Sequence, residues 1–346
     1  MIPGKLRRKF YHYLPAIKIF IRVLIACLLV YLFVCYLFLP SLRFLTSLFK
    51  KPISLLSSLG TQANLRNTNR RTNILLLGSG GANHTASDLT DSLIFASINL
   101  DTNETVLLSI PRDIWVESLR AKINTAYHYG EEKKKGGGLI LAKATVSEVL
   151  DQPVHYGFLL DFQGFVKAID LVDGIDIEVE RTFDDYKYPI SGKEDAEPEE
   201  LRYEHLHFDQ GLQHMDGERA LKFVRSRYAE GEEGTDFARS KRQQKMLLAL
   251  KNKLFSVKTI LNPKKIKELI KIFGDSIDTD IDEKDYPEFL KLALKLDQSK
   301  IKTVILDDDL LYNPPNDKYD GQWVLVPKSG NWQEIQDYVQ SLITIL

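Results

Sequence analysis

Short apolar runs, each bounded by glycine, proline or a polar loop, predict the strands of this chain. Residues 72–78 form such a run and end in a glycine turn, and the runs at 92–99 and 105–110 follow, joined by a polar loop. Later runs of the same character lie at 154–160, 175–179, 302–306 and 323–326. The pattern therefore predicts three consecutive strands early in the chain and further strands spread over the rest.

Segments with a helical spacing of apolar positions lie between these runs. They are residues 139–150, 162–171, 263–273, 282–296 and 332–345. Strands that alternate with helices favour layers of helices packed on one sheet. We therefore predict an α/β fold, a three-layer α-β-α domain with a central mixed sheet.

The amino-terminal region has a different pattern. Residues 23–39 are an uncharged apolar run, and apolar positions from residue 17 onward extend it to the length of a membrane span. No small-residue cleavage site follows, so we predict an uncleaved transmembrane helix at 17–39. Basic residues are more frequent before this run than just after it. This bias predicts a cytoplasmic basic tail at 1–16, a stalk at 40–71 and a catalytic domain on the outer face of the cell membrane, anchored by a single pass.

Charge and cysteine content exclude two classes of function. The 346 residues carry 46 Lys and Arg against 47 Asp and Glu, and this net charge of −1 gives no overall basic excess for binding nucleic acid. Both cysteines, Cys27 and Cys35, lie in the predicted span. The predicted outer domain thus has no thiol, which excludes an internal disulfide and cysteine redox chemistry there.

A cluster of arginines is the strongest chemical signal in the sequence. It consists of Arg225, Arg227, Arg239 and Arg242. An extended segment at 223–228 would turn the first two to one side, and a helix after it would place the last two and Gln243 on one face. Guanidinium groups hold phosphate oxygens through paired hydrogen bonds. We interpret the cluster as a phosphate-binding site, and the alternative is a solvated basic face.

Two carboxylates and a further arginine form a second candidate group. Asp91 lies just before the second predicted strand, with Asp88 close by, and Arg112 emerges at the end of the third. Strand ends of a rigid sheet often present functional side chains, and carboxylates beside an arginine suit a metal-bridged phosphate site. Three histidines lack the spacing of a metal site, and we interpret them as surface or core residues. They are His205, His207 and His214.

Several motifs follow one another between about residues 72 and 255. They are Asn73-Ile-Leu-Leu-Leu-Gly, Leu89-Thr-Asp-Ser, Ser109-Ile-Pro-Arg-Asp, Lys122-Ile-Asn-Thr-Ala-Tyr, Gly217-Glu-Arg-Ala-Leu, Arg225-Ser-Arg and Asp236-Phe-Ala-Arg-Ser-Lys-Arg-Gln. In this order they resemble the LytR-CpsA-Psr family. The resemblance implies a catalytic domain at 72–255, with residues 256–346 as a C-terminal α/β extension. It also implies a phosphotransferase that moves a glycopolymer from a polyprenyl-pyrophosphate carrier to a cell-wall acceptor such as peptidoglycan.

The resemblance implies roles for single residues as well. Asp91 matches a metal-associated carboxylate of the family, with Mg²⁺ or Mn²⁺ as the expected cofactor. Five residues match pyrophosphate-contacting positions, which are catalytic in this interpretation: Arg112, Arg225, Arg227, Arg239 and Gln243. Apart from the resemblance, Arg242 of the arginine cluster is expected to bind substrate, and Lys122 is expected either to line the acceptor side of the site or to cap and pack a helix. Many members carry an aspartate after the first glycine, where this chain reads Gly78-Ser-Gly-Gly. Asp88 is therefore the candidate second metal ligand, with Ser79 and His84 as alternatives.

The polyprenyl carrier requires an apolar cleft. The leucine-rich helices at 139–150 and 246–254 are its candidate walls, although a leucine stripe also fits ordinary core.

Two other functions stay open from the sequence. One is a polyprenyl-pyrophosphate hydrolase, which would use water as the acceptor, and the other is a non-catalytic regulatory or binding protein of the cell envelope.

Overall fold

The computed structural model describes residues 65–80, 88–190, 192–193 and 195–344. The basic tail at 1–16, the transmembrane helix at 17–39 and all but the end of the stalk lie outside these residues and stay predictions. Within the described ranges, no helix is both long and apolar enough to cross a membrane.

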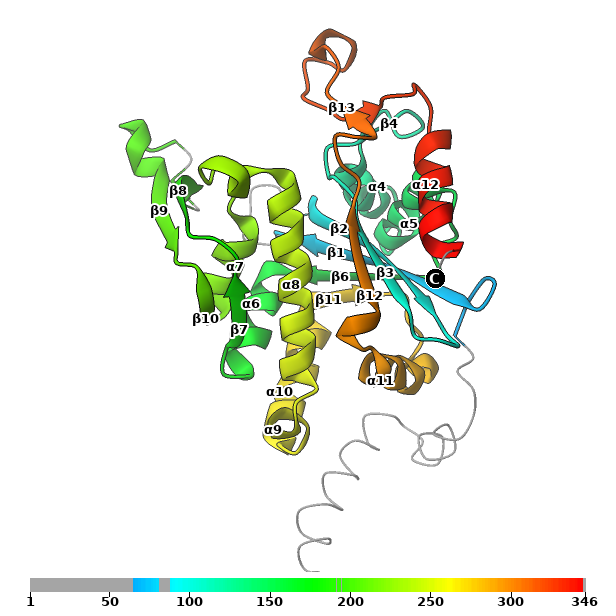
Figure 1. Ribbon diagram of the computed structural model, residues 1–346, viewed down its shortest axis with the longest axis vertical. Helices are drawn as coiled ribbons and strands as arrows, with labels where there is room; N and C mark the ends of the chain where they lie inside the picture. The colour runs from blue at the N-terminus through cyan, green and yellow to red at the C-terminus, as the bar shows by residue number, and fades with distance from the viewer. Residues whose placement is uncertain (1–64, 81–87, 191, 194, 345–346) are drawn as a thin grey trace, which may run out of the picture. The chain divides into compact units, whose positions relative to one another are not determined.

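A six-stranded mixed sheet forms the centre of the described domain, in the order β11-β6-β1-β2-β3-β12 (Figure 1). Its strands are β1 (Arg71–Ser79), β2 (Thr90–Asn99), β3 (Thr105–Ser109), β6 (Tyr156–Asp161), β11 (Ile277–Thr279) and β12 (Ile301–Ile305). β1 pairs antiparallel with β2 and parallel with β6, while β12 pairs parallel with β3. The prediction of a central mixed sheet is confirmed, with the three early strands at the expected places.

Helices cover both faces of this sheet because successive strand residues point to opposite sides. Leu75, Leu77 and Phe95 pack on one side in a core shared with helices α5 (Gly138–Leu150) and α12 (Gln333–Thr344). Ile74 and Ile94 point to the other side, where helices α8 (Asp236–Leu254) and α11 (Tyr286–Lys295) lie. The strands are therefore apolar on both faces, which explains why they read as continuous runs.

A second apolar core lies beside the sheet, in the green lobe at the left of Figure 1. Its helices are α6 (Phe162–Leu171), α7 (Gly217–Arg225) and α8. Its strands are β7 (Ile175–Val179), β8 (Phe183–Pro189), β9 (Tyr203–Phe208) and β10 (Gly211–Met215). The strand pattern did not predict the β8–β9 hairpin, because charged residues interrupt its apolar positions. Stacked rings of Phe183 and Phe208, 5.0 Å apart, hold its two strands to this core.

The C-terminal residues contribute directly to the main sheet through β11 and β12. Helices α9 (Val257–Ile260) and α10 (Pro263–Ser276) precede β11, in line with the helix predicted at 263–273. The strand predicted at 323–326 is wrong in extent: only β14 (Val326–Pro327) forms there, paired with β13 (Leu311–Tyr312). The remaining elements lie near the tip of β3: β4 (Trp115–Val116), β5 (Ala121–Lys122) and α4 (Ala126–Lys133).

Candidate functional site

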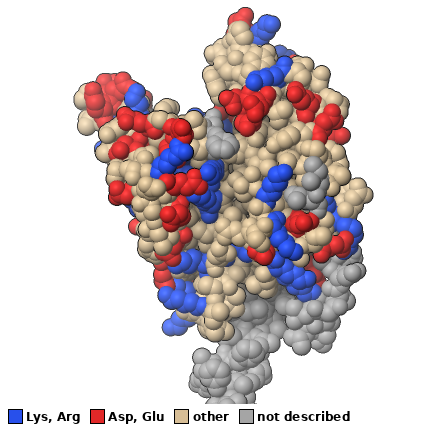
Figure 2. Space-filling view, viewed as in Figure 1, with Lys and Arg blue, Asp and Glu red and all other residues tan. Residues whose placement is uncertain are grey.

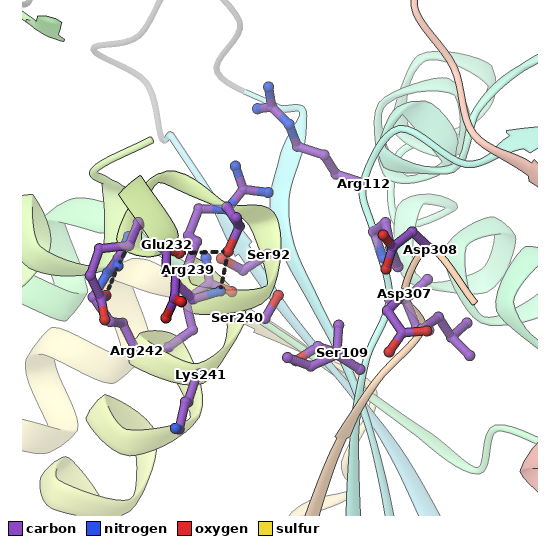
Figure 3. A pocket seen from close by; sticks show the side chains of 18 of the residues that line it. Ser92, Ser109, Arg112, Glu232, Arg239, Ser240, Lys241, Arg242, Asp307 and Asp308 are labelled. Carbon is purple, nitrogen blue, oxygen red and sulfur yellow. Dashed lines mark hydrogen bonds and ion pairs between the residues drawn. The ribbon is translucent and has the colours of Figure 1, made fainter. Parts of the chain in front are cut away.

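A cleft of about 660 Å³ opens between the first half of α8, the tips of β2 and β3, and the segment that follows β12. Figure 3 shows Arg239 and Lys241 on the α8 side, Arg112 above, and Asp307 and Asp308 on the opposite side. In the space-filling view of Figure 2, side chains of both charges lie at the left of this hollow, and Asp and Glu side chains gather at its upper right. The α8 side of the cleft therefore carries arginines and lysines together with glutamates such as Glu180 and Glu233, and the opposite side is acidic.

Asp91 and Arg112 meet at the mouth of this cleft, as the sequence pattern predicted. Asp91 lies at the start of β2 and Arg112 just after β3, and the antiparallel pairing of these strands brings the two side chains together. Nη1 of Arg112 forms an ion pair with Oδ1 of Asp91, and its Nε donates to Oδ2 of Asp113 at 3.3 Å. Burial would lower the pKa of Arg112, but the two carboxylates outweigh it and raise that pKa. The guanidinium is therefore permanently charged.

Lys122 and Asn124 extend this group from β5 and the turn after it. Nζ of Lys122 donates to Oδ1 of Asp113 at 2.7 Å, so Lys122 joins Arg112 through a shared carboxylate. The backbone carbonyl of Asn124 accepts a hydrogen bond from Oγ1 of Thr90 at 3.1 Å. The buried Oδ1 of Asn124 accepts none from any described residue. These contacts fix the tips of β2, β3 and β5 relative to one another.

Helix α8 supplies Arg239 and Gln243 to the cleft. The hydroxyl of Thr235 caps this helix by accepting from the backbone N–H of Ala238 at 3.1 Å. The helix predicted here is confirmed, and the one-turn spacing places Arg239 and Gln243 along the same cleft. Arg239 is largely buried, with only 7% of its surface exposed. A desolvated guanidinium is a stronger partner for a phosphate than one in water.

Arg242 lies on the same helix but is held beneath the cleft surface. Its guanidinium donates to three backbone carbonyls, those of Phe223 at 3.0 Å, Ser226 at 2.8 Å and Glu233 at 2.9 Å. Nη1 also contacts the Glu233 carboxylate at 2.8 Å. Burial lowers the pKa of Arg242, and Glu233 opposes that shift. The observed contacts are structural, and substrate binding by Arg242 stays a prediction.

The extended segment predicted at 223–228 is wrong in its first half, because α7 runs to Arg225. Asp216 caps this helix by accepting from the Arg219 N–H at 2.8 Å, and buried Ala220, Leu221 and Val224 lie at helical spacing. Arg225 is half-buried and lies 4.8 Å from the centre of the Phe162 ring. The non-helical segment after it leaves Arg227 exposed. The two arginines are thus neighbours at a helix end and not on one strand face.

A buried carboxylate that the sequence patterns did not single out holds this arginine segment. Asp185 in β8 is fully buried, and its Oδ2 accepts from Oγ of Ser226 at 2.6 Å and from the N–H groups of Arg227 and Tyr228 at 3.1 and 3.2 Å. Its Oδ1 accepts from the Lys187 N–H at 3.0 Å. An aspartate in a run of charged residues carries no signal of burial, so only the fold reveals its role.

The second metal ligand predicted from the sequence is more exposed than Asp91. Asp88 has 52% of its side chain exposed, and its carboxylate lies 3.8 Å from Nδ1 of His128. Within the described residues, no group of three or more His, Cys, Asp or Glu side chains is arranged so that it could hold a metal ion, and His84 lies outside these residues. His205 and His207 are exposed on β9 and share the carboxylate of Asp184.

An apolar cavity of about 150 Å³ lies next to the cleft, between the sheet and helices α6, α7 and α8. Its lining includes Leu76, Leu160, Phe162, Val224, Met246, Leu247 and Leu250. Gln243 and Ser92 line both this cavity and the cleft, so the two spaces adjoin there. Helix α8 therefore walls an apolar space, as predicted for residues 246–254. The prediction that the helix at 139–150 forms the other wall is wrong, because the buried side chains of this helix, α5, fill the core on the other face of the sheet.

A model of the LytR_cpsA_psr family matches residues 50–341, which is most of the chain. The chain belongs to this family. The match extends on both sides of the range 72–255 that carries the sequence motifs, and it includes β11 and β12.

Two similar proteins carry the same transferase name. A protein of Oceanobacillus iheyensis named polyisoprenyl-teichoic acid–peptidoglycan teichoic acid transferase TagU is 32% identical over 215 residues, covering 61% of this chain and 59% of the relative. The TagV protein of Bacillus subtilis, with the same transferase name, is 28% identical over 295 residues, covering 82% of this chain and 68% of the relative. The chain thus spans about three fifths to two thirds of these relatives.

Solved structures of this family have a similar fold. The crystal structure of Bacillus subtilis TagV superimposes with a TM-score of 0.56 at 26% identity, covering 80% of this chain and 99% of that one. A structure of TagT bound to LIIa-WTA has a TM-score of 0.54 at 21% identity, covering 83% of this chain and 98% of that one. The mixed α/β fold is therefore that of the family.

Proposed function

We propose that this protein is a membrane-anchored phosphotransferase that moves a glycopolymer from a polyprenyl-pyrophosphate carrier to a cell-wall acceptor such as peptidoglycan. One observation carries the proposal: the cleft lined by Arg112 and Arg239 adjoins an apolar cavity at Gln243 and Ser92. A lipid-linked pyrophosphate has this same sequence of parts, an apolar chain followed at once by phosphate groups. The transferase names of the relatives agree with such a substrate.

The apolar cavity would hold the first isoprene unit of the carrier. Its volume of about 150 Å³ is that of a cavity that encloses one benzene-sized molecule, so the rest of a long chain would leave the domain toward the membrane. Phe162 lines the cavity and also lies beneath the Arg225 guanidinium, so that arginine stands at the border of the apolar space. Phe162 would thus contact the lipid end of the donor, and the neighbouring Arg225 would contact its phosphate end.

The arginines would act on the pyrophosphate without exchanging protons. In the transfer step, an acceptor hydroxyl oxygen bonds to the phosphorus that carries the glycopolymer, and the bond from that phosphorus to the polyprenyl phosphate breaks. Negative charge builds up on the leaving phosphate, and Arg112, Arg239 and Arg225 stabilise it as fixed positive groups. The hydroxyl proton passes to a carboxylate, and Asp91 or Asp88 is the candidate acceptor.

The residues present fit a divalent ion such as Mg²⁺ or Mn²⁺. Asp91 lines the cleft with 35% of its side chain exposed, and Mg²⁺ binds with one or two protein carboxylates when phosphate oxygens and water complete its shell. Asp91, with Asp88 as second ligand, would hold it. When bound, the ion neutralises phosphate charge.

The predicted segment at 17–39 would place the catalytic domain at the outer face of the cell membrane, where a lipid-linked donor and the cell wall are both in reach.

The arginine cleft is part of an otherwise nearly neutral chain, which supports a local phosphate site and not a nucleic-acid surface.

The test is a reconstituted reaction of the full chain in membrane vesicles with a polyprenyl-pyrophosphate-linked glycan, with and without a peptidoglycan acceptor. We expect polyprenyl phosphate and a glycan–peptidoglycan product, formed only when the acceptor is present. Leu247→Trp, which fills the apolar cavity, should weaken donor binding, while Leu294→Trp on the exposed face of α11 should not. Equal release of polyprenyl phosphate with water alone would make the protein a hydrolase.

A further inference from the structure

Two aromatic side chains line the cleft on the wall opposite Arg239. Tyr312 and Trp323 have 44% and 45% of their surface exposed, whereas their chain neighbours Leu311 and Val324 are at 1% and 0%. The alternation turns the aliphatic side chains into the core and leaves the aromatic ones facing the cleft. A half-exposed aromatic ring in a concave site offers a flat apolar face to a ligand.

This wall is joined by hydrogen bonds to the segment that carries Arg112. The backbone N–H of Leu325 donates to the carbonyl of Asp113 at 2.9 Å, and the Trp115 N–H donates to the carbonyl of Leu325 at 2.9 Å. The Nδ2 of Asn313 donates to the Val324 carbonyl at 2.7 Å, next to the β13–β14 pair. The aromatic wall therefore has a fixed position relative to the phosphate end of the cleft.

The same wall is acidic and not basic. Asp307 and Asp308 follow β12 and line the cleft, where Figure 3 shows them across from Arg239 and Lys241. Carboxylates accept hydrogen bonds from hydroxyl groups and repel phosphate. A pyranose ring has an apolar C–H face and hydroxyls around its edge, so it matches a wall of aromatic rings and carboxylates. An anionic polymer does not match it.

We propose that Tyr312, Trp323, Asp307 and Asp308 form a binding subsite for the acceptor, an uncharged glycan chain. This inference rests on the proposed transfer reaction. In such a transfer the attacking oxygen and the leaving oxygen lie roughly in line through the phosphorus. The leaving polyprenyl phosphate lies toward the apolar cavity, which these four residues do not line, so the acceptor approaches from the cleft side.

The test is calorimetric titration of the full chain in detergent with an N-acetylglucosamine oligosaccharide as the probe. We expect binding to the wild type, a loss of about tenfold in affinity for Trp323→Ala or Tyr312→Ala, and near-normal binding for Trp323→Phe. A sulfated oligosaccharide of the same length should bind more weakly, and the double variant Asp307→Asn, Asp308→Asn should reduce that difference. Tyr286→Ala on α11, which lies outside the cleft, is the matched control. Thermal melting verifies that each variant is folded.

A parallel titration with a polyprenyl-pyrophosphate analogue separates this inference from the proposed function. The aromatic variants should bind the analogue as the wild type does. Unchanged oligosaccharide binding in the double variant Tyr312→Ala, Trp323→Ala would overturn the subsite. The aromatic variants could also bind a glycan-bearing donor more weakly while they bind the oligosaccharide normally. That result would show that the wall binds the donor polymer, and it would overturn the acceptor subsite. A wild type that binds the oligosaccharide but no analogue would contradict the proposed function and leave the glycan site in place.

Discussion

The buried carboxylate of Asp185 accepts a hydrogen bond of 2.6 Å from the hydroxyl of Ser226, the residue between Arg225 and Arg227. The same oxygen accepts from the Arg227 and Tyr228 N–H groups. Asp185 belongs to a β-hairpin and lies 41 positions before Ser226 in the chain. This distant hairpin thereby fixes the segment that follows α7. The positions of Arg225 and Arg227 depend on a residue that is not expected to touch substrate.

We predict that Asp185→Asn and Ser226→Ala impair transfer by misplacing Arg225 and Arg227. Hydrogen bonds to a charged group are worth about 1.5–3 kcal/mol each, so both variants should also lower the free energy of unfolding. The distinguishing readout is binding of a polyprenyl-pyrophosphate analogue by folded protein, which should weaken for both. Asp184→Asn is the control, because in the described part of the chain that neighbouring carboxylate pairs with the exposed His205 and His207. Normal analogue affinity in folded Asp185→Asn would contradict a positioning role.

Replacing Arg112 or Arg239 with lysine should slow transfer by about 100-fold, the typical effect of removing one contact to the developing charge. Lysine keeps the charge but cannot form the paired hydrogen bonds of a guanidinium. The measurement is single-turnover release of polyprenyl phosphate in the presence of acceptor. Arg70→Lys, at an exposed pair with Asp101, should react like the wild type. Full activity of both cleft variants would place the phosphates elsewhere.

Arg242 should behave differently from Arg239, although both are on α8. Arg242→Met removes the donors to three backbone carbonyls and leaves the Glu233 carboxylate without its buried partner. We expect a loss of about 3–5 kcal/mol in the free energy of unfolding, measured in urea. Arg70→Met, which breaks an exposed pair, should cost about 1 kcal/mol or less. A stable but inactive Arg242→Met protein would instead support direct substrate binding.

Glu180 should contribute to acid sensitivity, because Lys241 and Lys245 of α8 donate to its carboxylate and lower its pKa to about 2. A folded-state pKa below that of the unfolded chain means that this stabilisation is complete above about pH 4.5 and is lost as pH falls toward 2. Glu180 is partly exposed, so the effect is modest. The difference in melting temperature between wild type and Glu180→Gln should be largest near neutral pH and shrink below pH 4. A constant difference would show that these lysines do not set the pKa.

Local pattern was sufficient for the three early strands and for the main site residues at their tips. Long apolar runs predicted β1, β2 and β3 because both faces of the sheet are buried, and the pairing of these strands then necessarily brought Asp91 and Arg112 together. The family motifs pointed to Arg239 and Gln243, and helical spacing placed them one turn apart. Each of these inferences depends on residues that are close in the chain.

The tertiary structure decided which polar side chains are buried and which aromatic ones are not. Arg239 and Arg242 share one helical face in the sequence, and only the fold shows that α7 and the segment after it supply carbonyls to Arg242. Asp185 becomes a buried anchor because its hairpin packs against Ser226. Tyr312 and Trp323 reach the cleft because β12 pairs with β3 and brings the following segment to Arg112. Periodicity is a local property of the chain, whereas the partners that satisfy a polar group come from distant segments, and only the folded arrangement specifies them.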